Sequence, residues 1–293
     1  MAETGIALLG FGDNVVDCYL DRGLMYPGGN ALNAAVYAAR RGARAAYLGT
    51  FGSDAAGDHV RAVLARLGIA TAHCRRVAGE NGRAQVRLDG ANRTFCGSNK
   101  GGVARLDPFV PDAAVLAYLG RFDIVYTSCF SYLDPSLAAI SAASRLVSYD
   151  CSWTWRDSDL LERIGPHVDL AALSVGEGGM DLAKAMIARA HATGIGVVLA
   201  TMGAEGALAS AGGRLVAQAP APARVVDTLG AGDAFLTATL LGLVARGWQR
   251  AAPPGDQALA EALAEAAPFA AEICGLEGAF GHGAPLPEGF APC

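Results

Sequence analysis

Short apolar runs alternate along this chain with longer runs of helical periodicity. Strands are predicted at residues 6–10, 45–49, 124–126, 146–149, 170–174 and 196–200. Helices are predicted at residues 31–41, 58–67 and 182–192, and a glycine closely follows each of them as a stop signal. Strands that alternate with helices build a parallel sheet, because the crossover helices cover its two faces. The pattern therefore predicts an α/β fold with a mostly parallel central sheet.

Residues 82–97 break this alternation. Apolar and polar side chains alternate over residues 84–89, which is the period of a half-buried strand. Asp89-Gly90 then marks a turn, after which the chain can return antiparallel. We predict a β-hairpin here, which is either a lid over a binding site or an edge hairpin of the sheet.

Composition narrows the possible functions. The 293 residues are 52% apolar and 17% charged, so a sizeable core is available and the composition argues against global disorder. A net charge of −5, with no block of Lys and Arg, argues against nucleic acid as a partner. The seven cysteines are scattered without a C-x-x-C pair, so neither a zinc site nor a disulfide framework is expected.

Location follows from two further features. The first residues lack the basic-then-apolar order of a signal peptide. The longest apolar stretch, near residues 234–245, is too short to span a bilayer. We therefore expect a cytoplasmic protein with no membrane partner.

The segment Gly230-Ala231-Gly232-Asp233 is the most informative part of the chain. It is a glycine-rich turn that opens an apolar helical run, with an acid at the junction. The N–H groups of a helix N-terminus attract phosphate, and glycines let the phosphate approach closely. Asp233 then lies where a phosphotransferase needs a general base. The alternative is an ordinary loop in which the acid only caps the helix.

Two segments near the N-terminus carry groups that suit a sugar. Asn30 and Asn33 follow Gly28-Gly29 and lie one helical turn apart, so two amides share one face. Asp13 and Asp17 follow the first predicted strand, where acids of α/β sheets often face the ligand crevice. The alternatives are helix capping for the asparagines and turn formation for the acids.

A third segment suits a nucleotide, and familiar nucleotide motifs are excluded. Thr201-Met202-Gly203-Ala204-Glu205-Gly206 follows a predicted strand and is either a nucleotide-binding turn or a simple turn. No G-K-[ST] occurs, which excludes a Walker P-loop, and Val15 occupies the third glycine position of a dinucleotide fingerprint. The five histidines lie far apart in sequence, so they are not expected to be ligands.

Together these segments resemble the PfkB (ribokinase-like) family of carbohydrate kinases, in the right order over nearly the whole chain. The most specific match is Asp-Thr-x-Gly-Ala-Gly-Asp at residues 227–233. Within the family the chain is most similar to the kinases of fructoselysine, through residues 12–17, 28–37 and 281–284. The resemblance implies a ribokinase-like three-layer sandwich in one domain over residues 1–293. It also implies a small β lid at about residues 82–97, with part of residues 14–28.

The resemblance implies roles for the matching residues. Asp233 is expected to be the catalytic base, and Gly230, Ala231 and Gly232 to supply the anion hole. The sugar site is expected to comprise Asp17, Gly29, Asn30 and Asn33, with Asp13 and Arg93 as further candidates.

For the nucleotide and ions, the resemblance implies ATP at Thr201, Gly203 and Gly206. Glu177 matches the acid that organises Mg²⁺ through water. Asp227 matches an acid associated with a monovalent-cation site in ribokinase-like members, with K⁺ as the candidate ion. Ser174 stands where the family has Asn, which puts the nucleotide or metal-water contact there in question but not the reaction class.

The expected activity is ATP- and Mg²⁺-dependent phosphorylation of a primary hydroxyl on a sugar or sugar-amine. Fructoselysine or a related fructosamine, phosphorylated at the 6-position, is the expected substrate. A fructokinase or ribokinase of the same family is the rival enzyme, and a non-catalytic sugar- or nucleotide-binding regulator is the rival from another class. A homodimer formed through the β lid is also expected.

Overall fold

The computed structural model describes residues 4–89, 92–156 and 159–287, which form two sheets. The central sheet has nine strands in the order β13-β12-β11-β10-β9-β8-β1-β4-β5. In chain order the strands are β1 (Ala7–Gly12), β4 (Arg44–Phe51), β5 (Arg75–Arg76), β8 (Ile124–Ser128), β9 (Val147–Asp150), β10 (Leu170–Ser174), β11 (Val197–Thr201), β12 (Ala207–Ser210) and β13 (Val216–Gln218). Neighbours from β11 to β5 run parallel, whereas β12 and β13 pair antiparallel at one edge.

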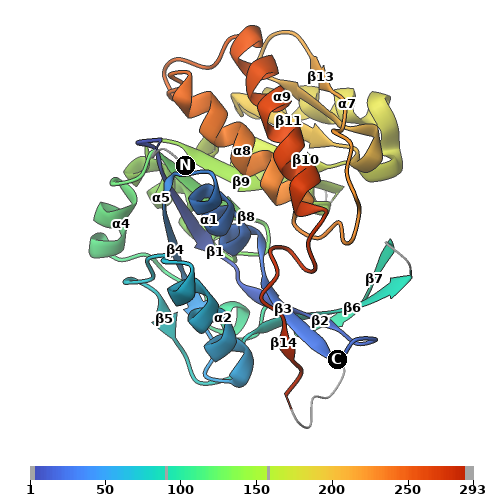
Figure 1. Ribbon diagram of the computed structural model, residues 1–293. Helices are drawn as coiled ribbons and strands as arrows, with labels where there is room; N and C mark the ends of the chain where they lie inside the picture. The colour runs from blue at the N-terminus through green and yellow to red at the C-terminus, as the bar shows by residue number, and fades with distance from the viewer. Residues whose placement is uncertain (1–3, 90–91, 157–158, 288–293) are drawn as a thin grey trace.

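Helices cover both faces of the central sheet (Figure 1). One face packs against α1 (Asn30–Arg40), α2 (Ala55–Arg66), α8 (Ala231–Ala245) and α9 (Asp256–Ile273). The other face packs against α4 (Ala113–Leu119), α5 (Leu137–Ala143), α6 (Leu160–Ile164) and α7 (Gly179–Ala192). Successive β1 residues serve the two cores, since Leu8 belongs to the first and Leu9 to the second. The predicted three-layer α/β arrangement is confirmed.

Helix α8 is more apolar than the other helices of more than ten residues, and its place in the fold explains why. It packs between α1 and α9, so side chains all around it are buried. An apolar helix of this kind belongs to a protein core. In the part of the chain that the structure describes, no helix combines the length and apolar character needed to cross a membrane.

The second sheet projects from one end of the molecule (Figure 1). Its order is β14-β3-β2-β6-β7, with β2 (Val15–Tyr19), β3 (Leu24–Gly28), β6 (Gly82–Asp89), β7 (Asn92–Ser98) and β14 (Ala284–Pro285). Strands β6 and β7 form the predicted antiparallel hairpin, with Val86 opposite Phe95. Val86 is fully buried against Tyr19 and Tyr26, so its apolar face is already covered within this chain. A single turn, α3 (Val103–Leu106), follows the hairpin.

Candidate active site

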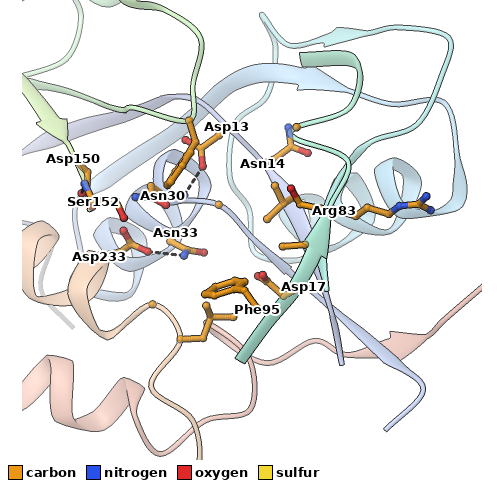
Figure 2. Close-up of a pocket in the computed structure, with 18 of the residues that line it drawn as sticks. Asp13, Asn14, Asp17, Asn30, Asn33, Arg83, Phe95, Asp150, Ser152 and Asp233 are labelled. Carbon is orange, nitrogen blue, oxygen red and sulfur yellow. Dashed lines mark hydrogen bonds between the residues drawn. The ribbon is translucent and has the colours of Figure 1, made fainter. Parts of the chain in front are cut away.

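A pocket of about 900 Å³ lies between the carboxyl ends of the central strands and the second sheet. Residues after β1 and β9, the last residue of β10 and the N-termini of α1 and α8 form one side. Strands β2, β6 and β7, with the segment after β7, contribute the other (Figure 2). The sequence-predicted residues that line it are Asp13, Asp17, Gly29, Asn30, Asn33, Ser174, Gly230, Gly232 and Asp233.

The start of α8 is built around Gly230. This residue has a φ of 77°, and a Cβ there would lie 2.2 Å from the Tyr37 hydroxyl oxygen. Both the left-handed backbone and the close approach therefore require glycine. At Gly232, by contrast, a Cβ would meet nothing within 4 Å, so this side of the turn is open.

The N–H groups of this turn differ in whether they have a hydrogen-bond acceptor. The Ala231 N–H donates to the Thr228 carbonyl at 3.3 Å. Among the described residues, the N–H groups of Gly232 and Asp233 have no acceptor. Free N–H groups at a helix N-terminus attract anions, so Gly232 and Asp233 offer the donors for a phosphoryl group.

The Asp233 carboxylate is held from two sides. The Asn33 amide donates from Nδ2 to Asp233 Oδ2 at 2.7 Å, and the Tyr126 hydroxyl lies 3.2 Å from Oδ1 (Figure 2 shows the first bond). Burial and the charge of Asp150 raise the pKa of Asp233 well above its usual value, while these two hydrogen bonds oppose the rise. A carboxylate with a raised pKa is a better proton acceptor, as a general base requires.

Tyr126 and Asp150 are functional candidates that the sequence reasoning missed. The Tyr126 hydroxyl is 3.1 Å from Asp150 Oδ2, so it lies between two carboxylates and can donate to one at a time. The Ser152 N–H donates to Asp150 Oδ1 at 2.6 Å. Burial raises the pKa of Asp150. The available signal was the position of Asp150 directly after the predicted strand 146–149, where strand-end acids meet ligands.

Asp13 organises the start of α1. Its Oδ2 accepts from the Asn30 N–H at 2.6 Å, and its Oδ1 accepts from the hydroxyls of Ser128 at 2.7 Å and Ser131 at 2.9 Å. Gly29 permits this approach, because a Cβ there would lie 3.0 Å from Asp13 Oδ2 and 2.8 Å from the Asn14 Cα atom. The carboxylate is thus engaged by the protein and fixes the start of α1, where Asn30 lies.

Asp17 and the two asparagines face the same space from different elements (Figure 2). Asp17 projects from β2 in the second sheet and is 4% exposed, and it contacts Gly28 so closely that a Cβ there would lie 2.4 Å from Oδ2. Asn33 comes from α1, and its buried Oδ1 has no hydrogen-bond partner among the described residues. A buried acceptor that lines a pocket is a site for a ligand hydroxyl.

Asp227 lies outside this pocket and is buried. Its carboxylate accepts hydrogen bonds from the Tyr19 hydroxyl, from the Leu229 N–H at 3.0 Å and from the Gly278 N–H at 3.2 Å. These donors stabilise the carboxylate itself. They also tie β2 of the second sheet to the segment that leads into Gly230.

The predicted nucleotide residues separate into two groups. Ser174 ends β10, is exposed and lines the pocket, and it pairs in register with Thr201 at the end of β11. Gly203 and Gly206 form the turn after β11, outside the pocket lining, with φ values of 60° and 92°. The side chains of Glu177 and Arg93 lie outside the described residues.

The acidic side chains of the described residues limit the ways in which Mg²⁺ can bind. Among the described residues, no group of three or more His, Cys, Asp or Glu side chains could enclose a metal ion. Mg²⁺ at kinase sites is bound largely by water and substrate phosphates with one or two carboxylates, so a dedicated protein cage is not required. The site is compatible with that mode of binding.

Comparison with known proteins assigns the chain to a family. The profile described as pfkB family carbohydrate kinase matches residues 6–282. The chain belongs to this family. It is therefore a carbohydrate kinase by family.

Two curated relatives and one solved structure are informative. Fructosamine kinase FrlD of Bacillus subtilis (strain 168) is 38% identical over 283 residues, covering 95% of this chain and 94% of the relative. Fructoselysine 6-kinase of Escherichia coli (strain K12) is 34% identical over 234 residues, covering 79% and 87%. A Vibrio cholerae O395 fructokinase double mutant with fructose, ADP and potassium bound is 19% identical, with a TM-score of 0.72 and coverage of 98% and 97%. Similar solved structures include ribokinases, so the ribokinase-like fold is confirmed.

Proposed function

We propose that this protein transfers the γ-phosphoryl group of ATP to the 6-hydroxyl of a fructosamine, with fructoselysine or a related glycated amine as substrate. One observation carries the proposal: Asp233, with a raised pKa, lies beside two unpaired helix N-terminal N–H groups in a pocket large enough for more than a hexose. The names of the curated relatives support the fructosamine class over other sugars.

In this proposal Asp233 accepts the proton of the sugar hydroxyl as that oxygen attacks the γ-phosphorus, and the bond from this phosphorus to the oxygen of ADP breaks. Asn33 and Tyr126 fix the orientation of the carboxylate, so the base is already oriented when the sugar binds. The N–H groups of Gly232 and Asp233 stabilise the charge on the equatorial phosphoryl oxygens. Bound ATP with Mg²⁺ supplies the phosphoryl group and neutralises its charge.

The remaining residues of the site take the following roles. Asp17, Gly29, Asn30 and Asn33 bind the sugar, while Asp13 holds the start of α1 in place. Thr201, Gly203, Gly206 and Ser174 receive the nucleotide, and Glu177 orders Mg²⁺ through water. Arg93 remains a candidate for substrate contact from the second sheet. A potassium ion near Asp227 requires the Tyr19 hydroxyl to turn away from the carboxylate.

The second sheet (the lid sheet) acts in this proposal as a lid that excludes water from the transferred phosphoryl group. We also propose a homodimer through this lid. Strand β7 is the edge of the lid sheet, and Phe95 on it is 60% exposed. Edge strands with exposed apolar side chains favour pairing with another chain. A cytoplasmic location accompanies the proposal, because the reaction consumes ATP.

The proposal is tested by ADP release on a substrate panel of fructoselysine, fructosylglycine, fructose and ribose. We expect kcat/KM for one of the two fructosamines to exceed that for either free sugar by at least about tenfold, with phosphate found on the 6-oxygen by NMR. Higher kcat/KM on fructose or ribose would instead favour the rival sugar kinase. Sugar binding without ADP release on any substrate would favour the non-catalytic regulator.

A further inference from the structure

A fructosamine presents more than a sugar to its kinase. Beyond C1 it carries an amine and, when the amine belongs to an amino acid, a carboxylate. The pocket has acids on the side of the transferred phosphoryl group, where Asp233, Asp150 and Asp13 lie. A carboxylate would be repelled there, so it must extend toward another part of the pocket.

Three cations line this pocket, namely Arg83, Lys100 and Arg105. Arg83 is engaged elsewhere, since it forms an ion pair with Glu80 at 3.4 Å and its guanidinium points away from Asp17 and Asp233 (Figure 2). Lys100 and Arg105 are exposed, and neither has an ion pair with any residue that the structure describes. These two cations are available to a ligand.

The turn that carries Lys100 is held in a defined conformation. Lys100, Gly101 and Gly102 have φ values of 55°, 94° and 54°, and a positive φ is costly for lysine. The Tyr132 hydroxyl donates to the Lys100 carbonyl, and a Cβ on Gly101 would lie 2.9 Å from the Tyr132 ring. Tyr132 therefore anchors the Lys100 turn against the pocket, rather than leaving it free in solvent.

Arg105 belongs to the same cluster. It lies in the helical turn that follows Gly102, and its charge lowers the pKa of Tyr132 against the rise caused by burial. Lys100 and Arg105 thus flank one tyrosine at the side of the pocket formed by the segment after the hairpin. Exposed aromatic surface of Trp153 lines the same pocket and suits the hydrocarbon part of an amino acid.

We propose that Lys100 and Arg105 bind the carboxylate of the amino-acid part of the substrate. This inference rests on the proposed fructosamine kinase activity and adds a specificity site to it. The two residues act on substrate affinity, because their charges do not change during phosphoryl transfer. A neutral substrate of the same shape should gain nothing from them.

The test compares fructosylglycine with fructosylglycinamide, which replaces the carboxylate by an uncharged amide of nearly the same shape. Binding is measured by calorimetry without ATP, and turnover by ADP release. We expect the native protein to prefer the acid by about tenfold, since charge-assisted hydrogen bonds at exposed sites are of this order. This preference should shrink as NaCl is raised, because salt screens exposed charges.

Lys100→Met and Arg105→Gln should each weaken binding of the acid by about threefold and leave binding of the amide within about twofold. The double variant should bind the two ligands equally. The KM for ATP should stay within about twofold in every variant. Lys184→Met is the matched control, because Lys184 is exposed on α7 and paired with Asp181 at 3.3 Å.

Each failure has a distinct signature. Equal binding of acid and amide to the native protein overturns the carboxylate site, even if both are phosphorylated and the kinase proposal stands. The carboxylate site is also overturned if Lys100→Met raises the KM for ATP equally with fructosylglycine and with fructosylglycinamide. The cations would then serve the nucleotide. Turnover of free hexoses, with neither fructoselysine nor either glycine compound bound or phosphorylated, rejects the fructosamine proposal and this site with it.

Discussion

Replacement of Asp150 by Asn tests the electrostatic account of the base. Asp150 Oδ2 and Asp233 Oδ1 lie 3.1 and 3.2 Å from the same Tyr126 hydroxyl oxygen. The two carboxylates therefore titrate as a pair, and each disfavours ionisation of the other. Asp150→Asn removes one of the two charges and leaves the tyrosine hydroxyl free to donate to Asp233.

The expected size of the change in the pKa of Asp233 follows from these distances. The two carboxylate oxygens are at most about 6.3 Å apart, because each lies within 3.2 Å of the shared hydroxyl. Coulomb's law at an effective dielectric constant of about 20 gives a repulsion on the order of 2–3 kcal/mol. Without it, the pKa of Asp233 falls, and the acid limb of the kcat–pH profile should move to lower pH by about one unit or more.

A second variant checks the direction in which the pKa of Asp233 moves. The Tyr126 hydrogen bond lowers the pKa of Asp233, so Tyr126→Phe should move the acid limb to higher pH, opposite to Asp150→Asn. Tyr149→Phe is the matched control, since the Tyr149 hydroxyl donates to Asp134 at 2.8 Å, and neither residue lines the pocket. It should leave the pH profile unchanged.

The assay is kcat from ADP release at saturating substrates between about pH 5 and pH 9, with the melting temperature recorded at each pH. A purely structural role for Asp150 would lower the melting temperature or kcat without moving the acid limb. If Asp150→Asn moved the limb upward or not at all, the two carboxylates would not be coupled and the reasoning would be refuted.

Three further outcomes are expected. Asp233→Asn should lower kcat by about 10²–10⁴ with little change in ATP affinity or melting temperature, and near-normal turnover would remove Asp233 as the base. Asn33→Ala should raise the sugar KM, because its unpaired Oδ1 is lost, and should move the acid limb upward; a loss of stability with both KM values unchanged would show a packing role instead. Tyr19→Phe removes the hydroxyl donor from the Asp227 carboxylate and should increase the response of kcat to added K⁺ over Na⁺, whereas equal rates in both salts would argue against a cation there.

The parts of the fold that follow from local pattern were predictable. The predicted strand 170–174 coincides with β10, and the predicted helix 31–41 overlaps α1 within one residue at each end. Apolar runs and glycine stops encode these elements directly. The hairpin at residues 82–97 was also predictable, because alternation and an Asp-Gly turn are local signals.

Elements that depend on distant partners were not predictable. Strand β14 is only Ala284–Pro285, and it forms because β3 offers an open edge. Nothing in a Gly- and Pro-rich segment signals that pairing. The same holds within the site: Asp150 lies 83 positions from Asp233 in the sequence, and a tyrosine on a third element connects them. Pairwise geometry of this kind arises only after the sheet has assembled.

The last prediction concerns Val86, and the structure changes its meaning. The alternating pattern predicts a half-buried strand, and Val86 is fully buried against Tyr19 and Tyr26 of the same chain. Val86→Asp therefore buries an unpaired charge inside the lid sheet, which costs on the order of 3 kcal/mol or more. The lid sheet should loosen while the central sheet stays folded, because Val86 belongs to a small separate cluster.

The kinetic consequence separates lid closure from dimerisation. Tyr19 also donates to Asp227, so loosening the lid should disturb the approach to Gly230 as well as the sugar site. We expect a higher sugar KM and faster ATP hydrolysis without sugar in Val86→Asp, with Val86→Ala intermediate. Light scattering of both variants reports the oligomeric state independently. If the native protein is a monomer and these kinetic changes still occur, the lid acts within one chain; unchanged kinetics in Val86→Asp would mean that the second sheet does not control access to the site.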